Sequence, residues 1–272
     1  MRFSIVTICY NQASFLRECI ESVLSQDYPD LEYIVVDPGS TDGSREIIEE
    51  YSDGISRTIL EPDDGPADGL NKGFNRATGD IYGFLNADDR LLPGAVAKAA
   101  RGLRSRPWVD VLSGHGYVVN REGRRMRKFF SDVFCPEALA LQACCLFQQG
   151  TFFRADAFHA AGGFNPEAEA CWDGELWIDM YDSGARFARL NEFLAEFRVY
   201  PESISGRGDT ARIREESRRR RFRKVFGRQR ERLDWLLRVA YLCRKYALSP
   251  WSLSERLLRG SIFYGCAPRL CR

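Results

Sequence analysis

Residues 4–44, SIVTICYNQASFLRECIESVLSQDYPDLEYIVVDPGSTDGS, decide the fold. An apolar, β-branched run over 2–9 predicts a buried strand. Apolar residues then recur at helical spacing from Leu16 to Leu24, and a second apolar run covers 31–37. A strand, a helix and another strand in this order are typical of a parallel βα fold.

The same alternation continues through the first hundred residues. Helical patterns cover 44–51 and 66–77, and strand patterns cover 56–61 and 80–86. Repeated βα units with continuous apolar strands predict a parallel sheet that helices cover on both faces.

Beyond residue 108 the pattern becomes mixed. Strand patterns at 109–119 and 124–130 flank a turn, and helical patterns follow at 154–162 and 175–184. We therefore predict an α/β fold with a mixed, mostly parallel sheet flanked by helices.

Composition is typical of a folded protein kept in a reducing compartment. The chain has 272 residues, of which 44% are hydrophobic, and this is enough for one large domain. Its nine cysteines are odd in number, and the chain contains no CxxC pair and no signal-peptide pattern, so we expect a cytoplasmic protein. No apolar run is long enough to predict a membrane-spanning helix.

Charge is distributed unevenly along the chain. Residues 201–272 contain 19 Lys and Arg against 7 Asp and Glu, whereas residues 1–200 contain 20 against 31. The hydrophobic residues of the basic region recur at helical spacing up to Ser249-Pro250, so we expect 209–272 to be a basic amphipathic helical tail.

Two roles remain open for this tail. A basic amphipathic helix with tryptophans suits an anionic membrane surface, whereas an ordinary helix would pack its apolar stripe on the domain or on a second subunit. Nucleic acid is not an expected partner, because the tail has neither zinc-ligand spacing nor a nucleic-acid fold signature.

Polar side chains gather where the predicted parallel strands end. In open α/β sheets ligands bind at these carboxyl ends. No GxGxxG or GxxxxGK[ST] motif follows the first strand, which argues against a dinucleotide or P-loop site. The strand-end residues are Thr7, Tyr10, Asn11, Asp37, Ser40, Asp42, Asp63, Asp64, Asn86, Asp88 and Asp89.

Asp88 and Asp89 are the most informative of these residues. Two adjacent carboxylates after a buried strand repel each other and are costly to desolvate unless a cation is near. A plainer alternative is that they cap the next helix, for which Asp89 is the better candidate.

Three segments carry a family resemblance: residues 4–44, DDGPADGLNKGFNRATGDIYGFLNADD (63–89) and GGFNPEAEACWDGELWIDM (162–180). Together they resemble the inverting, GT-A-fold glycosyltransferases of the large bacterial family 2, over about residues 1–205. The resemblance implies a Rossmann-like GT-A domain over 1–208. It also implies a nucleoside-diphosphate sugar as donor, with UDP or dTDP favoured.

The resemblance assigns a divalent metal, Mn²⁺ or Mg²⁺, to Asp88. Such a metal would neutralise the leaving diphosphate. Asn86 stands where the family's motif usually has its first Asp, and is a second possible ligand.

The resemblance also implies a donor side. Thr7, Tyr10 and Asn11 would lie along the nucleoside, and Asp37 would accept a hydrogen bond from the base. Asp68, Asn71 and Lys72 share one helical face that is a candidate for lining the donor site, with a solvated face as the alternative. Ser40, Asn86 and Ala87 complete the predicted donor-side residues.

Asp173 matches the family's general base, with Glu175 as the fallback. Trp172 and Tyr200 occupy places where the family often has Glu and His. Gln148, Gln149 and Thr151 resemble the segment that shapes the acceptor side. His115 and His159 match neither role, and we interpret both as structural, as we do Trp177.

These features predict a metal-dependent inverting glycosyltransferase. The acceptor would be a hydroxyl of a glycan or a lipid-linked molecule in cell-surface polysaccharide assembly, at the inner face of the membrane. A sugar-nucleotide-binding module without turnover and a nucleotidyltransferase that forms sugar nucleotides are the alternatives.

Overall fold

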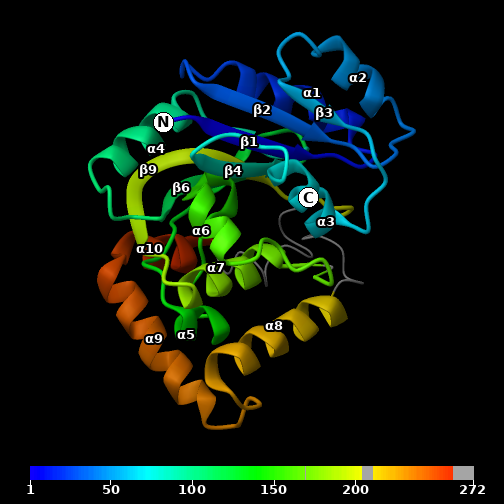
Figure 1. Ribbon diagram of the computed structural model, residues 1–272. Coiled ribbons are helices and arrows are strands. Elements are labelled where there is room, and N and C mark those ends of the chain that lie inside the picture. The colour runs from blue at the N-terminus through cyan, green and yellow to red at the C-terminus, as the bar shows by residue number, and fades with distance from the viewer. Residues whose placement is uncertain (169, 204–210, 260–272) are drawn as a thin grey trace.

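A curled nine-stranded mixed sheet forms the centre of the molecule (Figure 1). The computed structural model describes residues 1–168, 170–203 and 211–259. The strands are β1 (Phe3–Ile8), β2 (Leu31–Val36), β3 (Arg57–Ile59), β4 (Ile81–Asn86), β5 (Arg90–Leu91), β6 (Val111–Val119), β7 (Arg125–Phe129), β8 (Thr151–Arg154) and β9 (Phe187–Arg198).

Helices cover both faces of this sheet. The core cluster on one face includes side chains of α1, α2 and α4, and the cluster on the other face includes side chains of α3, α6 and α7. The helices are α1 (Ala13–Leu24), α2 (Ser44–Glu50), α3 (Pro66–Phe74), α4 (Ala95–Arg104), α5 (Pro136–Ala140), α6 (Ala155–Ala160), α7 (Trp172–Asp182), α8 (Ala211–Phe226), α9 (Asp234–Leu248) and α10 (Pro250–Arg259), with the 3₁₀ turn η1 (Gln148–Gly150).

The first four strands form the parallel part of the sheet, in the order β3-β2-β1-β4. Phe3 and Ile5 of β1 pack on one face, whereas Val6 packs on the other. Successive side chains of a strand point to opposite faces, so a strand covered on both sides must be apolar at nearly every position. The prediction of an α/β fold with a parallel, doubly covered first half is confirmed.

The second half of the sheet is mixed and curls back on the first. Strand order continues β4-β8-β6-β9-β5, so β5 lies at the end of the sheet although it follows β4 directly in the chain. Arg90 pairs with Glu196 and Leu91 with Ala195 of β9. The curl therefore brings the end of β9 to the short segment that follows β4.

The sequence prediction missed β5, β8 and β9. Arg189, Asn191 and Glu192 interrupt the apolar pattern of β9, and only its later part, which includes Leu194 and Ala195, is fully buried. Strands 109–119 and 124–130 are confirmed as β6 and β7, and the two helices predicted beyond residue 150 are confirmed as α6 and α7.

The basic tail packs on the domain through its first helix. Phe222 of α8 is 2% exposed and packs against Ala140 and Leu141 at the end of α5. The sequence predicted a helix that continues to Ser249, but α8 ends at Phe226, because Gly227 adopts φ +65° and terminates it. The predicted domain boundary at 208–209 lies outside the described residues.

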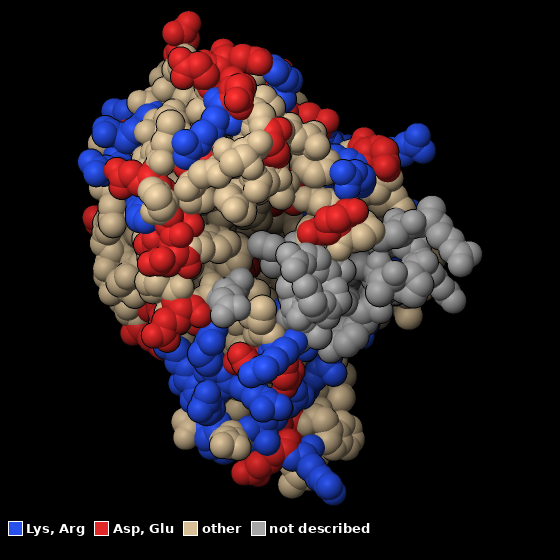
Figure 2. All heavy atoms as spheres, turned by 90° about the vertical axis from the view of Figure 1, so that its right-hand side faces the viewer, with Lys and Arg blue, Asp and Glu red and all other residues tan. Residues whose placement is uncertain are grey.

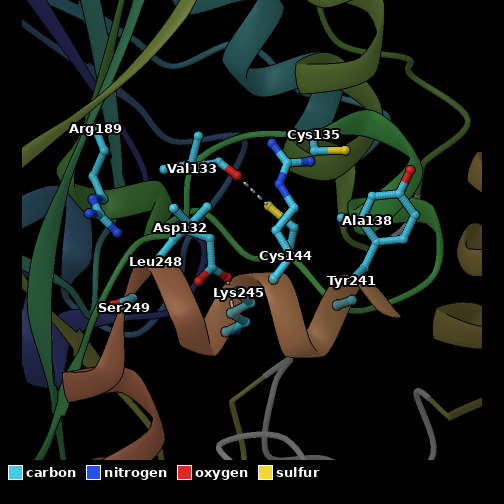
Figure 3. Close-up of a pocket in the computed structure, with 12 residues that line it drawn as sticks. Asp132, Val133, Cys135, Ala138, Cys144, Arg189, Tyr241, Lys245, Leu248 and Ser249 are labelled. Atoms are coloured by element: carbon cyan, nitrogen blue, oxygen red, sulfur yellow. Dashed lines mark hydrogen bonds and ion pairs between the residues drawn. The ribbon is translucent and has the colours of Figure 1, made fainter. Parts of the chain in front are cut away.

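An ion pair with a buried carboxylate holds helix α9 on the domain. The ammonium of Lys245 lies 2.8 Å from a carboxylate oxygen of Asp132, which precedes α5 (Figure 3). Tyr241, one helical turn earlier, packs against Ala138 and Cys144. Across the described part of the chain, no helix has the length and apolar character that a bilayer crossing requires.

Candidate active site

Asp89, after β4, is a structural carboxylate. It is 1% exposed and accepts hydrogen bonds from the side chains of Asn86, at 3.3 Å, and Gln149, at 2.9 Å. The backbone N–H of Arg198 donates to its other oxygen at 2.9 Å. The alternative that Asp89 caps the next helix is wrong, because α4 begins only at Ala95.

Asp88 is the more open of the two carboxylates. Its side chain is only partly buried, and the hydroxyl of Tyr200, which donates to Oε1 of Gln12 at 3.1 Å, is a polar neighbour that affects its pKa. Burial raises the pKa of Asp88, against the opposing effects of Tyr200 and of the positive charge of Arg198. Burial and the charge of Asp88 together raise the pKa of Asp89 well above its usual range. Asp88 is thus the carboxyl group left for a ligand.

Arg198 is the fixed cation beside this pair. Its side chain is 1% exposed, and its Nε donates to the carbonyl oxygen of Asp88 at 2.9 Å. Its Nη2 lies 2.7 Å from a carboxylate oxygen of Glu18 on α1. Arg198 therefore joins the end of β9, the turn after β4 and α1. Sequence reasoning did not identify this role.

The open ends of β1 and β2 carry the next predicted residues. Tyr10 is 62% exposed, and Asn11 is also exposed and adopts φ +52°. The backbone N–H of Asn11 donates to the hydroxyl of Ser40 at 2.8 Å, and its side chain accepts from the N–H of Thr41 at 2.9 Å. Ser40 therefore holds this loop, while Tyr10 and Asn11 offer the accessible surface.

Asp37 has one satisfied and one unsatisfied oxygen. Oδ1 accepts from the N–H groups of Gly39 and Ser40 and from Nε of Arg45, at 2.8–3.0 Å. Oδ2 is buried and has no hydrogen-bond partner among the described residues. Burial acts to raise the pKa of Asp37, but the hydrogen bonds from Ser40 and Arg45 outweigh it, and the net shift is downward. Asp37 therefore shapes the turn and also retains an unused acceptor.

The side chain of Thr7 does not belong to the open site. It is fully buried, and its hydroxyl accepts from Tyr33 at 3.0 Å and lies 3.7 Å from the sulfur of Cys19. Thr7 has the same strand parity as Phe3 and Ile5, so its side chain faces α1. The predicted contact of this side chain with a nucleoside is corrected, and parity was the signal for it.

The predicted donor face of α3 is used within the protein. Lys72 lies 2.8 Å from Asp68, which lowers the pKa of Asp68 and raises that of Lys72. Asn71 donates to the carbonyl oxygen of Phe164 at 2.8 Å and accepts from its N–H at 2.9 Å. Asn71 thus fixes the loop that leads to α7, and the predicted contact of this helical face with the donor stays a prediction.

Asp173 lies in the first turn of α7, after Cys171, which adopts φ +58°. Its side chain is partly buried, and burial raises its pKa while the positive charge of Arg221 on α8 opposes this. The neighbouring Trp172 packs in the same apolar cluster as Phe84 of β4. The start of α7 therefore shares an apolar cluster with the strand that leads to Asp88.

Glu175 is already engaged as an ion-pair partner. It is 6% exposed, accepts two hydrogen bonds from Arg220 at 2.9 and 3.1 Å, and accepts one from Asn165 at 3.1 Å. A carboxylate held in this way is poorly placed to take a proton from a substrate. Its assignment as the fallback base is corrected.

The predicted acceptor segment is buried. Gln148 donates to the carbonyl oxygen of Phe84 at 2.8 Å, and the hydroxyl of Thr151 lies 2.8 Å from that of Ser113. Gln148 and Gln149, which bonds to Asp89, therefore support the end of β4 and the turn after it, whereas Thr151 bonds to β6. All three side chains are buried, and their predicted contact with the acceptor stays a prediction.

Several residues predicted to be structural have that role. His115 is 2% exposed and bonds to Asn191 at 3.0 Å, and His159 lies 3.3 Å from the hydroxyl of Tyr82. Trp177 is 1% exposed in the core. Ala87 is also 1% exposed, so it contributes backbone rather than a side chain to the predicted donor side.

The oxygen donors present suit a cation that takes most of its ligands from a substrate. Asp88 offers a carboxylate, and the amide oxygen of Asn86 is a second donor, because its nitrogen faces Asp89. No cluster of three or more His, Cys, Asp and Glu occurs among the described residues. Mg²⁺ and similar ions are commonly held by one or two carboxylates together with substrate phosphates, and this arrangement fits that pattern.

Comparison with known proteins points to one family. The model of the family described as glycosyl transferase family 2 matches residues 4–159. TuaG of Bacillus subtilis (strain 168), named as a teichuronic acid biosynthesis glycosyltransferase, is 28% identical over 212 residues, 74% of this chain and 81% of that protein. The glycosyltransferase alr2836 of Nostoc sp. is 24% identical over 97% of this chain and 90% of its own length.

Solved structures share the fold. S. aureus TarS 1-349 in complex with UDP-GlcNAc matches with a TM-score of 0.66 and 18% identity, over 96% of this chain and 77% of that one. The mannosyltransferase PcManGT from Pyrobaculum calidifontis, in complex with GDP-Man and Mn²⁺, matches with a TM-score of 0.64 and 19% identity, over 96% and 76%. The predicted GT-A architecture is confirmed.

The unequal surroundings of the two carboxylates predict unequal effects on stability. Asp89→Ala removes the acceptor of three buried donors, and we expect it to lower the free energy of unfolding by about 2–5 kcal/mol. Asp88→Ala relieves repulsion at a partly exposed site and should cost less than about 1 kcal/mol. Urea unfolding of both variants measures this difference, and equal losses would contradict the division of roles.

Proposed function

Because the chain belongs to glycosyl transferase family 2, we propose that it transfers a sugar from a nucleoside-diphosphate donor to a hydroxyl group, with inversion at the anomeric carbon. The observation that carries the proposal is the sorting of the two carboxylates after β4. The carboxylate of Asp89 accepts hydrogen bonds from three donors of the protein, whereas Asp88 stays partly exposed beside Tyr200.

The nucleoside half of the donor is assigned to the ends of β1 and β2. Tyr10 and Asn11 offer exposed surface there, and Oδ2 of Asp37 is an acceptor without a partner. Uracil and thymine both present an N–H to such an acceptor, so UDP and dTDP donors are favoured. The neighbour TarS was solved with UDP and with UDP-GlcNAc, which supports this choice, while PcManGT was solved with GDP-Man.

Asp88, with Asn86, is the proposed holder of a divalent cation, Mn²⁺ or Mg²⁺. Such an ion would stabilise the charge that develops on the leaving diphosphate. Tyr200, which follows β9, donates to Gln12 beside this site and stands where the family resemblance would place a histidine.

Asp173 is the proposed general base. It takes the proton of the acceptor hydroxyl as the oxygen attacks the anomeric carbon, and the bond from that carbon to the diphosphate oxygen breaks. The nucleoside diphosphate leaves with the electron pair. A single displacement of this kind inverts the anomeric configuration.

The proposed acceptor is a glycan or a lipid-linked intermediate of cell-surface polysaccharide. Relatives named for teichuronic acid biosynthesis and for O-antigen biosynthesis support this class. We place the protein in the cytoplasm, at the inner face of the membrane.

The surface proposed to meet the membrane lies on α9 and α10. Large apolar side chains remain exposed there, from 44% for Leu237 to 81% for Leu258. Basic residues such as Arg244 and Arg256 accompany them, and this mixture of apolar and basic side chains suits an anionic bilayer surface. The exposed residues are Leu233, Trp235, Leu236, Leu237, Val239, Leu248, Trp251, Leu257 and Leu258.

The donor assignment is tested by ligand-induced stabilisation. We expect one of the UDP-, dTDP- or GDP-sugars to raise the melting temperature in the presence of Mn²⁺, since a ligand that binds only the native state stabilises it. Asp88→Ala should abolish this metal-dependent shift and leave the melting temperature without ligand nearly unchanged. An undiminished Mn²⁺-dependent shift in the variant would refute the role of Asp88.

The base is tested by turnover with the donor found in this way. Asp173→Asn should retain the donor-induced shift and reduce kcat by about 10²- to 10⁴-fold, the usual contribution of a general base. Glu175→Gln is the matched control, since it breaks the ion pair with Arg220 and should chiefly lower stability. Full turnover by Asp173→Asn would show that another residue is the base. A complete absence of turnover in the wild-type protein would favour a sugar-nucleotide-binding module.

Membrane contact is tested by co-sedimentation with liposomes. The double variant Trp235→Ser/Trp251→Ser should lose most binding to anionic liposomes, and wild-type binding should weaken as salt is raised. Trp108→Ser is the matched control, because Trp108 is 56% exposed, as is Trp235, but lies outside the tail. Equal sedimentation of the double variant and the control would reject α9 and α10 as the contact surface.

A further inference from the structure

We propose that Arg221 of the basic helix α8 is a positioning residue for Asp173, fixing the first turn of α7 and placing its positive charge at that turn. The inference rests on the proposed function, in which Asp173 is the general base. It assigns a part of the C-terminal tail to the active site.

The guanidinium of Arg221 is buried against that first turn. Its side chain is 9% exposed, and Nη1 donates to the carbonyl oxygen of Cys171 at 3.4 Å. A Cβ placed on Gly174 would lie 3.2 Å from Cζ and 3.4 Å from Cδ of Arg221, and closer still to Nη1. Asp173 thus lies between two residues that the same guanidinium contacts, and only glycine at 174 leaves room for it.

Neighbouring residues of α8 hold the rest of α7. Arg220 pairs with Glu175 at 2.9 Å, and Lys224 pairs with Asp179 one turn further along. The hydroxyl of Ser217 donates to the carbonyl oxygen of Ala170 at 2.9 Å, just before α7. Helix α8 is therefore docked along α7 by polar contacts at successive turns, which explains how a buried arginine can be held here.

Arg221 differs from these neighbours in how its charge is used. Within the described residues it forms no ion pair under 4 Å, and its buried Nε has no hydrogen-bond partner. A buried cation without a direct counter-ion interacts strongly with nearby charge, because the surrounding dielectric is low. The carboxylate affected is that of Asp173, whose pKa the positive charge of Arg221 lowers.

The charged and titratable groups around Asp173 act in opposite directions. Burial is the largest influence on its pKa and raises it, Arg221 from α8 lowers it, and Glu175 on its own helix raises it. Cys145, before η1, and Cys171 also lie within electrostatic range, and their thiol pKa values are raised chiefly by burial. A base acts only when deprotonated, so Arg221 extends the activity of Asp173 toward lower pH.

The position of α8 agrees with this role. Figure 2 shows Lys and Arg side chains gathered on the lower part of one face, the part of the molecule to which α8 belongs, below a hollow in that face. The exposed members, such as Arg212 at 88% and Arg219 at 72%, pair with acidic residues of the same helix. Arg221 lies on the opposite, buried side of α8.

The experiment measures the pKa of Asp173 directly, by ¹³C NMR of the carboxyl carbons in the ligand-free full-length protein, with Asp173→Asn to assign the signal. Arg221→Gln should raise this pKa. Arg219→Gln is the matched control, because it removes one positive charge from the exposed side of the same helix, and it should leave the pKa unchanged. An unchanged pKa in Arg221→Gln would overturn the inference, whatever the result for turnover.

Two further variants keep the test decisive if Arg221→Gln does not fold. Gly174→Ala retains every charge but displaces the guanidinium, so it should also raise the pKa of Asp173. Arg221→Lys keeps a positive charge at this position, so its Asp173 pKa should lie between those of the wild type and Arg221→Gln. With the donor identified above, the acidic limb of kcat/KM should move to higher pH in Gly174→Ala, while the UDP-induced thermal shift stays as in the wild type. If the variants lose stability while the pKa of Asp173 and the acidic limb of kcat/KM do not move, Arg221 is only a packing residue. If Asp173 is not the base, Asp173→Asn will instead show full turnover.

Discussion

The arrangement of the site depends on the contacts that Arg198 makes with Asp88, Asp89 and Glu18. Its backbone donates to Asp89 and its guanidinium reaches the carbonyl oxygen of Asp88 and the carboxylate of Glu18. These contacts join β9, the turn after β4 and α1, three segments that are far apart in the sequence. A buried guanidinium must satisfy its donors within the protein, so its partners have little freedom to move. Tyr200, two residues further on, is placed beside Asp88 by the same contacts.

The first half of the fold was predictable because its information is local. Periods of two and of 3.6 residues identify each strand and helix, and the parallel order then brings Tyr10, Asn11, Asp37 and Asp88 to the carboxyl end of the sheet. What the sequence left ambiguous was the direction of individual side chains. Thr7 is buried by the parity of its strand, and parity is readable in a sequence once the covered face is known.

The division of work between neighbouring acids was not predictable, because it depends on distant partners. Asp89 is satisfied by Gln149 and Arg198, and Glu175 is satisfied by Arg220, from segments that no local pattern connects. Strand β9, which carries Arg198, was itself hidden by polar residues in its middle. Side-chain chemistry gave the candidates at the site, and long-range contacts decided which of them stay free.

The folded structure shows that part of the positive charge of the tail is used within the protein. The excess of Lys and Arg beyond residue 200 first suggests an external anionic partner, yet Arg220, Lys224 and Lys245 neutralise acidic residues of the domain itself. Ion pairs with a buried partner are screened by salt much less than exposed charges are. Salt should therefore loosen any contact of α9 and α10 with a membrane while α8 stays on α7. Loss of such a contact would then leave α7, the helix that carries Asp173, undisturbed.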